Sequence, residues 1–390
     1  MRTSQFFKPH YDVIIIGARC AGASTAMLLA RAGMNVLVVD RQKYGSDITS
    51  THALMRTGVL QLKRWGVLPK IMAAGTPAIT MTTFHYGREE FPIDIKADHG
   101  VEFLCAPRRT VLDRILVDAA QEAGADVRHG ISLIELMKSA GGSVTGVRLR
   151  DASGAIYDVS SDMVIGADGR QSLVARKVQA QTYVEGKSSS GYAYGYFKGP
   201  SRDGFHWYFG DDVTAGIIPT NDNRQCIFVG VPRDQFADTF RKNLVQGFHQ
   251  IAGANSPELL ATIREGRLDG KLRGFAGCPG YLKQSFGPGW CLVGDAGYFK
   301  DPMTAHGITD ALRDAELLSH AVLEGTSGAF AEYQNTRDAL SLTMFDVTDV
   351  ISSFDWDINE IKNHHSRLSN AMKFEAEHMA GLSAHKNLAA

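Results

Sequence analysis

Two patterns of apolar and polar positions follow each other at the start of the chain. Residues 12–16 and 36–40 are almost continuous apolar runs, typical of strands that are buried on both faces of a parallel sheet. The segment between them, residues 23–32, is rich in alanine and leucine and predicts a helix. A strand, a helix and a strand in this order predict a βαβ unit and an α/β fold.

The pattern changes further along the chain. Residues 109–123 carry apolar side chains at helical spacing, whereas residues 191–230 alternate and contain turn signals, which predicts a mostly antiparallel sheet. Residues from 308 onward are mainly helical in pattern. We therefore expect a discontinuous α/β domain, an inserted sheet domain and a helical C-terminus. Their predicted bounds are 10–75, 100–180 and 280–340 for the first, 76–99 and 181–275 for the second, and 341–390 for the third.

The turn after the first strand has a glycine at each end. Gly17 allows the tight turn, and Gly22 allows the helix to pack closely on the strand. The free N–H groups at the helix N-terminus can then bind a pyrophosphate. Asp40 ends the second strand, about 20 positions further on, where a ribose hydroxyl is held in such units. Arg19 replaces the usual middle glycine and either places a cation near the phosphates or pairs with a neighbouring acid.

Two further motifs lie far from this turn in the sequence. Asp168 and Gly169 follow an apolar run at residues 162–165. Gly294 and Asp295 follow another, and a proline and a further glycine come shortly after them. Each motif alone is weak evidence. All three, in this order and at this spacing, indicate a single site for one FAD.

Length and composition set outer limits on the function. The 390 residues suffice for two joined domains. The net charge of −1 argues against non-specific binding of nucleic acid. The five cysteines lack the spacing of zinc ligands or redox pairs, so we expect no metal site and a reducing, cytoplasmic location. Residues 1–10 do not read as a signal peptide, and the apolar runs are too short to span a bilayer, so no membrane partner is expected.

With its three motifs, the chain resembles the single-component flavoprotein aromatic hydroxylases of the p-hydroxybenzoate hydroxylase type. It is also similar to the broader group that contains geranylgeranyl reductases and flavin-dependent halogenases. The resemblance extends over residues 11–333. It implies a GR2-type, Rossmann-like FAD-binding domain with an inserted substrate-binding sheet. The Trp-x-Trp-x-Ile-Pro signature of halogenases is absent at residues 206–209, which ranks halogenation low.

The resemblance also assigns roles to residues. Asp40 is expected to hold the adenosine ribose, Arg109 to lie along FAD, and Asp295 to bind a hydroxyl of the flavin ribose. Gly307 begins a helix at the pyrimidine edge of the flavin, where free N–H groups and the helix dipole stabilise the charge of the reduced ring. The expected FAD-binding residues are Gly17, Ala18, Arg19, Ala21, Gly22, Asp40, Arg41, Arg109, Asp168, Gly169, Gly294, Asp295, Gly307, Ile308 and Thr309.

In the hydroxylase reaction that the resemblance implies, NAD(P)H reduces FAD, and O2 then forms a flavin C4a-hydroperoxide that hydroxylates an aromatic substrate. In the resembled family NAD(P)H docks transiently without a dedicated Rossmann domain, and this chain likewise has no second glycine fingerprint. Pro302 is expected beside the isoalloxazine. His306 and His52 are candidate bases, since histidine titrates near neutral pH, but either can equally be a hydrogen-bonded structural residue. The expected partners are a small aromatic molecule and O2, and we expect the chain to be a monomer or a homodimer.

Several alternatives stay open at this stage. Tyr192, Tyr194 and Tyr196 fall on one face of a strand and either line an aromatic pocket or pack inside the sheet domain. Trp207 and Phe209 lie on the strand face opposite to that of His206 and Tyr208. One of these two strand faces is expected to meet the substrate. The second candidate function is an FAD-dependent reductase of C=C bonds. The third is a non-catalytic flavin-binding module. A requirement for O2 separates the first function from the second.

Overall fold

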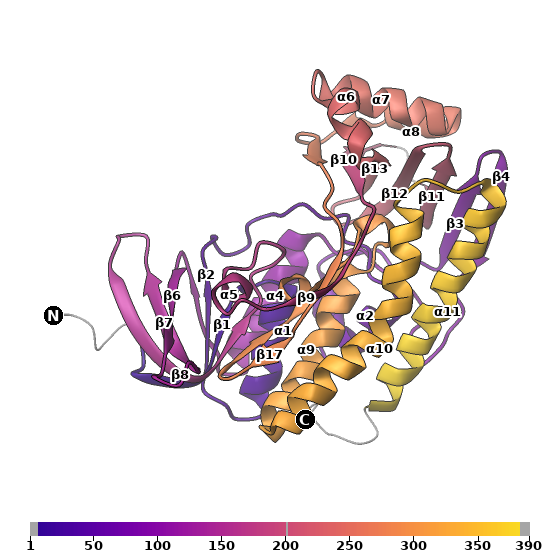
Figure 1. The fold of residues 1–390 in the computed structure, drawn as a ribbon. Coiled ribbons are helices and arrows are strands. Elements are labelled where there is room, and N and C mark those ends of the chain that lie inside the picture. The colour runs from indigo at the N-terminus through magenta and orange to yellow at the C-terminus, as the bar shows by residue number, and fades with distance from the viewer. Residues whose placement is uncertain (1–6, 200–201, 383–390) are drawn as a thin grey trace.

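The computed structural model describes residues 7–199 and 202–382, and Figure 1 shows how their sheets are arranged. The first sheet has a parallel centre, in which β1 lies between β2 and β8. In spatial order its strands are β17 (Phe286–Gly287), β18 (Trp290–Leu292), β8 (Ile156–Gly166), β1 (His10–Ile16), β2 (Val36–Asp40) and β5 (Asp126–His129). The antiparallel strands β6 (Ser132–Lys138) and β7 (Val144–Arg150) extend from β8. The predicted βαβ unit is confirmed.

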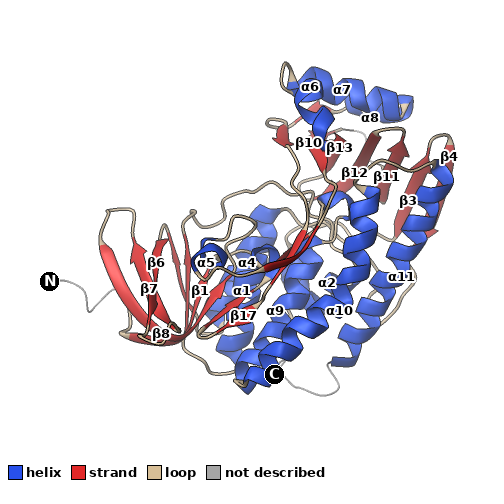
Figure 2. Cartoon of the chain, in the orientation of Figure 1, coloured by secondary structure: helices blue, strands red, loops and turns tan. Residues whose placement is uncertain are grey.

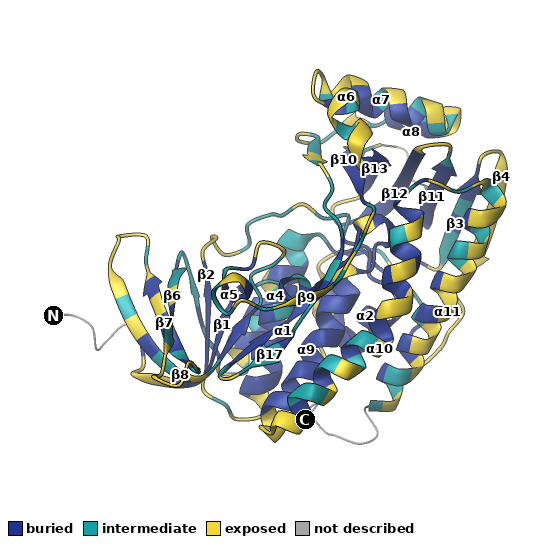
Figure 3. Ribbon diagram, viewed as in Figure 1, coloured by how far each residue is buried: buried dark blue, intermediate teal, exposed yellow. Residues whose placement is uncertain are grey.

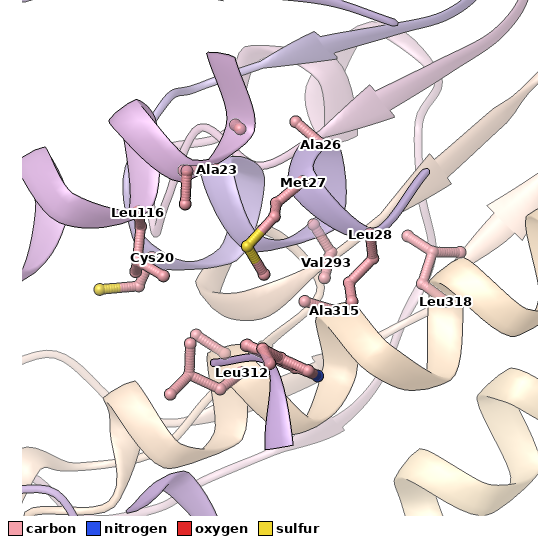
Figure 4. Close-up of a cluster of buried hydrophobic side chains, with 14 of the residues drawn as sticks. Cys20, Ala23, Ala26, Met27, Leu28, Leu116, Val293, Leu312, Ala315 and Leu318 are labelled. Atoms are coloured by element: carbon pink, nitrogen blue, oxygen red, sulfur yellow. The ribbon is translucent and has the colours of Figure 1, made fainter. Parts of the chain in front are cut away.

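Helix α1 (Cys20–Arg31) is buried along almost its whole length. It contacts α4 (Arg109–Glu122) on one side and α9 (Gly307–Glu324) on the other. Figure 4 shows Met27 and Leu28 of α1 beside Leu312 and Ala315 of α9 in this core. Small alanines along α1 let the three helices approach closely, so the start of α1 and the start of α9 are held near the same edge of the sheet.

The second sheet is antiparallel except for the parallel pair β3–β11. In spatial order its strands are β14 (Arg267–Leu268), β10 (Ser190–Lys198), β13 (Arg224–Pro232), β12 (Val213–Thr220), β11 (Phe205–Gly210), β3 (Met81–Tyr86) and β4 (Glu89–Asp94), and β15 (Arg273–Phe275) also pairs with β10. This confirms the predicted mostly antiparallel sheet within an α/β fold.

Helices cover both faces of the second sheet (Figure 2). Helices α6 (Phe236–Phe240), α7 (Leu244–Asn255) and α8 (Pro257–Glu265) cover one face. Helices α10 (Ser327–Ile351) and α11 (Ile358–Leu382) pack toward the other. Figure 3 shows that α9 is mostly buried, whereas α6–α8 and α11 expose their outer sides. The remaining helices are α2 (Arg56–Arg64), α3 (Leu68–Ala73), α5 (Leu173–Lys177), and the 3-10 helices η1 (Arg233–Gln235), η2 (Gly294–Ala296) and η3 (Pro302–Thr304).

Three features differ from the sequence-based expectation. Strand β6 follows β5 after a short turn, where no strand was expected. Strand β9 (Thr182–Glu185), expected in the inserted domain, instead forms a small third sheet with β16 (Tyr281–Lys283) and β19 (Tyr298–Phe299). Helix α10 runs unbroken past position 341, so no element ends at that expected boundary. The domain limits themselves stay predictions. Residues 383–390 of the expected C-terminal segment lie outside the described residues.

Among the described helices, none combines the length and the apolar character that a membrane crossing requires.

Candidate functional site

A cavity of about 900 Å³ extends from the carboxyl ends of β1, β2 and β8 to the second sheet. Sites in open α/β sheets lie at this edge, because the loops that follow the strands converge there. The three sequence motifs all contribute to its wall. The expected site residues that line it are Gly17, Arg19, Ala21, Asp40, Arg41, His52, Arg109, Asp168, Gly169, Asp295, Pro302, Gly307 and Ile308. The expected residues outside its lining are Ala18, Gly22, Gly294, His306 and Thr309.

The glycines of the first turn are required by close contacts. Gly17 has a φ of 109°, and a Cβ there would lie 2.3 Å from the carbonyl oxygen of Ala167. A Cβ at Gly22 would lie 1.9 Å from the carbonyl oxygen of Gly17. No side chain fits at either position. The first turn therefore packs directly on the segment that follows β8, and this contact brings the first two motifs together.

Asp40 and Arg19 lie at the same end of the cavity. The Asp40 carboxylate accepts the N–H of Ala18 at 2.8 Å and that of Gln42 at 2.7 Å, so it ties the first turn to the end of β2. Arg19 is the residue before α1, and its Nη1 is buried without a hydrogen-bond partner in the described chain. It forms no ion pair within the described residues either. This placement fits the role of a cation that faces a phosphate, rather than that of a paired surface residue.

Two half-buried carboxylates, Asp168 and Asp295, line the cavity. Asp168 accepts the N–H of Leu173 at 2.6 Å through Oδ2, while its Oδ1 has no partner in the described chain. Burial raises the pKa of Asp295 to about 6, against the opposing effect of the Arg170 and Arg109 charges. A carboxylate oxygen that is shielded from water and has no partner, such as Oδ1 of Asp168, is satisfied when a hydroxyl of a bound ligand donates to it. This donor set fits the ribose and ribityl hydroxyls of FAD.

The N-terminus of α9 supplies a third part of the wall. Gly307 and Ile308 line the cavity, and a Cβ added to Gly307 would meet nothing within 4 Å. Ala305 has a left-handed φ of 50° and turns the chain into this helix. Thr309 lies behind the wall and accepts the N–H of Met55 at 3.2 Å. The open helix N-terminus suits the electron-rich edge of a flavin ring, as the sequence predicts.

His306 points away from the cavity. Its Nε2 lies 2.8 Å from Oε2 of Glu375 in α11, and the other oxygen of Glu375 accepts from Arg313 at 2.8 Å. Burial alone would raise the pKa of Glu375, but His306 and Arg313 together lower it to about 2. The carboxylate is therefore ionised, and His306 donates from Nε2. This placement fits the structural alternative for His306, whose side chain is not part of the cavity lining, and its role as a base stays a prediction.

The acids around His306 are already paired with cations. His306, Asp310 and Glu375 come close enough to one another to hold a metal ion. However, Lys300 and Arg313 both bond to Asp310, and Arg313 also bonds to Glu375. A divalent cation would compete with these two fixed positive charges.

The far end of the cavity is aromatic. The rings that line it come from β10, β11, β13 and β15 and are Tyr192, Tyr194, Trp207, Phe228 and Phe275. Tyr196 follows on the same strand face but packs on His52, with ring centroids 5.5 Å apart. Phe209 packs on Trp356 and His365 instead. Each of the two alternatives for these tyrosines therefore applies in part. Tyr192 and Tyr194 line the cavity, whereas Tyr196 packs behind its wall.

Sequence reasoning missed several cavity residues. Arg273 and Phe275 belong to β15, which has three residues, too few for an alternating pattern to be recognised. Arg170 lines the cavity and stacks on Phe275, with its guanidinium carbon 4.4 Å from the ring centre. Lys300 is buried in the wall beside Asp310. Only the second motif, which contains Arg170, carried a signal for any of them.

A glycine turn at a helix N-terminus, half-buried acids suited to ribose hydroxyls and a second open helix N-terminus surround one cavity. Together they define a dinucleotide-binding flavoprotein. The sequence matches the FAD binding domain family over residues 10–344, and the chain belongs to this family. It is an FAD-dependent oxidoreductase.

The relatives of the chain carry different activities. Digeranylgeranylglycerophospholipid reductase 1 of Methanococcoides burtonii is 26% identical over 326 residues, which cover 81% of this chain and 74% of that protein. The flavin-dependent brominase Bmp2 has the same fold, with a TM-score of 0.80 at 20% identity over 95% of this chain and 93% of that one. PqsL, a probable FAD-dependent monooxygenase from Pseudomonas aeruginosa, has a TM-score of 0.73 at 18% identity over 93% and 100%. The resemblance drawn from the motifs is confirmed at the level of this superfamily.

Proposed function

We propose that the protein is an NAD(P)H-dependent FAD monooxygenase that hydroxylates a small aromatic or heteroaromatic substrate. The observation that carries this proposal is the group of aromatic rings in the wall of the same cavity that Pro302 and the N-terminus of α9 also line. Aromatic side chains bind planar rings through offset or edge-to-face contacts. The overall reaction inserts one oxygen atom of O2 into a C–H bond to give C–OH, while the other oxygen atom, NAD(P)H and a proton yield water and NAD(P)+.

The residues of this chain have three tasks in that reaction. The first turn of α1, with Arg19, would hold the FAD pyrophosphate, and Asp295 would hold the ribityl chain. Gly307 and Ile308 would face the flavin ring with their N–H groups. When bound, FAD supplies the redox chemistry between NAD(P)H and O2. The rings of Tyr192, Tyr194 and Trp207 would orient the substrate and exclude water from the reacting atoms.

A second candidate is an FAD-dependent reductase of C=C bonds. The observation that favours it is the identity of 25–28% to several digeranylgeranylglycerophospholipid reductases over about four fifths of the chain. Such a reaction needs reduced FAD and an alkene but no O2. The two candidates therefore differ in a single co-substrate.

The test measures NAD(P)H oxidation by the purified yellow protein, with and without O2, across a panel of phenols, indoles and hydroxypyridines. We expect substrate-stimulated oxidation that consumes O2 and yields a product one oxygen atom heavier. Inert aromatics, together with oxidation of the reduced flavin by an isoprenoid alkene under anaerobic conditions, would replace the proposal with the reductase. Phe275→Ala should weaken the stimulation by aromatics. Phe91→Ala, on the exposed strand β4, is the matched control.

A further inference from the structure

His52 is held in a backbone conformation that a histidine seldom adopts. Its φ is 52°, in the left-handed region, and its N–H donates to Ser50 Oγ at 3.1 Å. For a residue other than glycine this conformation costs roughly 1 kcal/mol or more. The side chain is buried and lines the cavity at its aromatic end. A buried, strained histidine in a cavity wall calls for a functional explanation.

The contacts of His52 determine where its proton lies. Burial, together with the charges of Arg108 and Arg109, lowers the pKa of His52 to about 3, so the ring is neutral. Nε2 lies 3.2 Å from the hydroxyl of Tyr196, which burial keeps protonated by raising its pKa. A phenol is a stronger donor than a neutral imidazole, and an imidazole nitrogen is a stronger acceptor than a phenol oxygen. The hydroxyl therefore donates to Nε2, and His52 carries its proton on Nδ1.

This Nδ1–H group has no partner. Nδ1 is buried and makes no hydrogen bond within the described part of the chain. An unsatisfied buried donor costs about 1–3 kcal/mol, which a bound acceptor would recover. Tyr196 does not line the cavity, so it serves as a positioning residue that acts through His52.

Positive charge gathers beside this donor. Arg273 lines the cavity opposite Tyr194 in the β10–β15 register, and its Nη2 lies 3.0 Å from Oδ2 of Asp47. The same oxygen lies 3.2 Å from Nη2 of Arg108, whose guanidinium covers the Tyr196 ring at 4.0 Å. One carboxylate is thus shared by two guanidinium groups. The cluster of Asp47, Arg108 and Arg273 carries one net positive charge at the aromatic end of the cavity.

We infer that His52 and Arg273 form the subsite for the polar group of the substrate, and that this group is an acceptor oxygen, a carbonyl or a carboxylate, attached to the aromatic ring. This inference rests on the proposed function, because it assumes that the aromatic end of the cavity takes the substrate. His52 acts in it as a hydrogen-bond donor, in place of the base that its sequence position suggested.

The first test needs no substrate. In the FAD-loaded full chain labelled with [15N]histidine, the signals that disappear in His52→Phe identify His52. We expect a neutral ring with the proton on Nδ1 at pH 7. Tyr196→Phe should shift the ring toward a mixture of both tautomers, which a purely structural contact would not do. A proton on Nε2 in the unaltered protein would overturn the donor assignment, whatever reaction the enzyme catalyses.

The second test compares three probes by their perturbation of the flavin absorbance: indole-3-carboxylate, indole-3-carboxamide and indole. The amide should bind about tenfold more tightly than indole, and the carboxylate should bind more tightly again because Arg273 is positively charged. His52→Phe should remove this preference for both, whereas Arg273→Met should remove only the advantage of the carboxylate over the amide. The control is His85→Phe, at a buried histidine outside the cavity, and it should leave all three affinities unchanged.

Equal affinities for the three probes, or no binding by any of them, would overturn the subsite. Anaerobic turnover of an alkene would instead overturn the proposed function and leave the tautomer of His52 as it was.

Discussion

Nε2 of His306, at the start of α9, lies 2.8 Å from the carboxylate of Glu375 in the middle of α11, and neither side chain is accessible to solvent. The two residues are 69 positions apart in the sequence. Arg313 bonds to the other oxygen of Glu375, so the C-terminal helix is anchored by charge directly behind the helix N-terminus that faces the cavity. Loss of this anchor should therefore affect both the stability of the fold and the binding of the flavin.

Glu375→Gln is expected to destabilise the protein by about 3 kcal/mol, because Arg313 and His306 lose their buried counter-charge. Denaturant unfolding of the FAD-free protein measures this change. FAD affinity should also fall, since His306 no longer fixes the turn before Gly307. Glu377→Gln, an exposed acid on the same helix, is the control and should stay within about 0.5 kcal/mol of the unaltered protein. Equal effects of the two substitutions would show that the buried network does not anchor α11.

Asp295→Asn should have opposite effects on stability and on FAD binding. The pKa of Asp295 is raised from 3.8 to about 6, so between these pH values the folded protein holds a proton that the unfolded chain has lost. The stability of the FAD-free protein therefore falls as pH rises through this window, by about 2–3 kcal/mol in total. The asparagine variant should lack this fall and be more stable at pH 7.

The same substitution should weaken FAD binding about tenfold, because a charge-assisted hydrogen bond to a ribityl hydroxyl becomes a neutral one. Fluorescence titration of the FAD-free protein with FAD measures the affinity. Asp162→Asn, at a side chain that is 76% exposed, controls for a general loss of negative charge. A variant with unchanged FAD affinity would remove Asp295 from the proposed binding set.

The parts of the site that sequence reasoning predicts are those that depend on local chain geometry. The first turn needs glycine at positions 17 and 22 for steric reasons that its own neighbours impose. The role of His306 depends on Glu375, whose contact arises only when α11 packs against α10 and α2. Tyr194 and Tyr196 share a strand face, and only contacts with other elements decide that the first lines the cavity and the second supports His52. Periodicity identifies a face but not the element that covers it.

Gly17→Ala should prevent the first turn from forming. The added Cβ would meet a backbone oxygen at 2.3 Å, and the φ of 109° is unfavourable for alanine, so we expect a loss of about 3–5 kcal/mol. Gly33→Ala separates the two causes, because Gly33 has a φ of 89° but nothing within 4 Å of the added Cβ. That control should lose about 1–2 kcal/mol and keep its FAD. Thermal unfolding and the flavin content of the purified proteins provide the measurement, and a Gly17 variant that retains FAD would contradict the steric argument.

The pair formed by His85 and His206 in the second sheet should make the protein sensitive to acid. Nε2 of His206 lies 3.0 Å from the carbonyl oxygen of Asp203, to which it donates, so its Nδ1 accepts from Nε2 of His85 at 3.0 Å. Burial, and to a smaller extent His206, lowers the pKa of His85 from 6.5 to about 4. The stability that depends on neutral His85 is thus complete above pH 6.5 and is lost as the pH falls toward 4.

His85→Gln keeps a donor toward His206 but cannot take up the proton. Its stability should fall less steeply than that of the unaltered protein between pH 6.5 and 4.5, with a difference on the order of 1 kcal/mol after allowance for solvent screening. Urea unfolding at several pH values measures both curves, and His10→Gln, at a side chain that is 49% exposed, should run parallel to the unaltered protein. If the His85→Gln curve also runs parallel, the acid sensitivity arises elsewhere, and His52, whose pKa is lowered to about 3 in the cavity wall, becomes the next residue to replace.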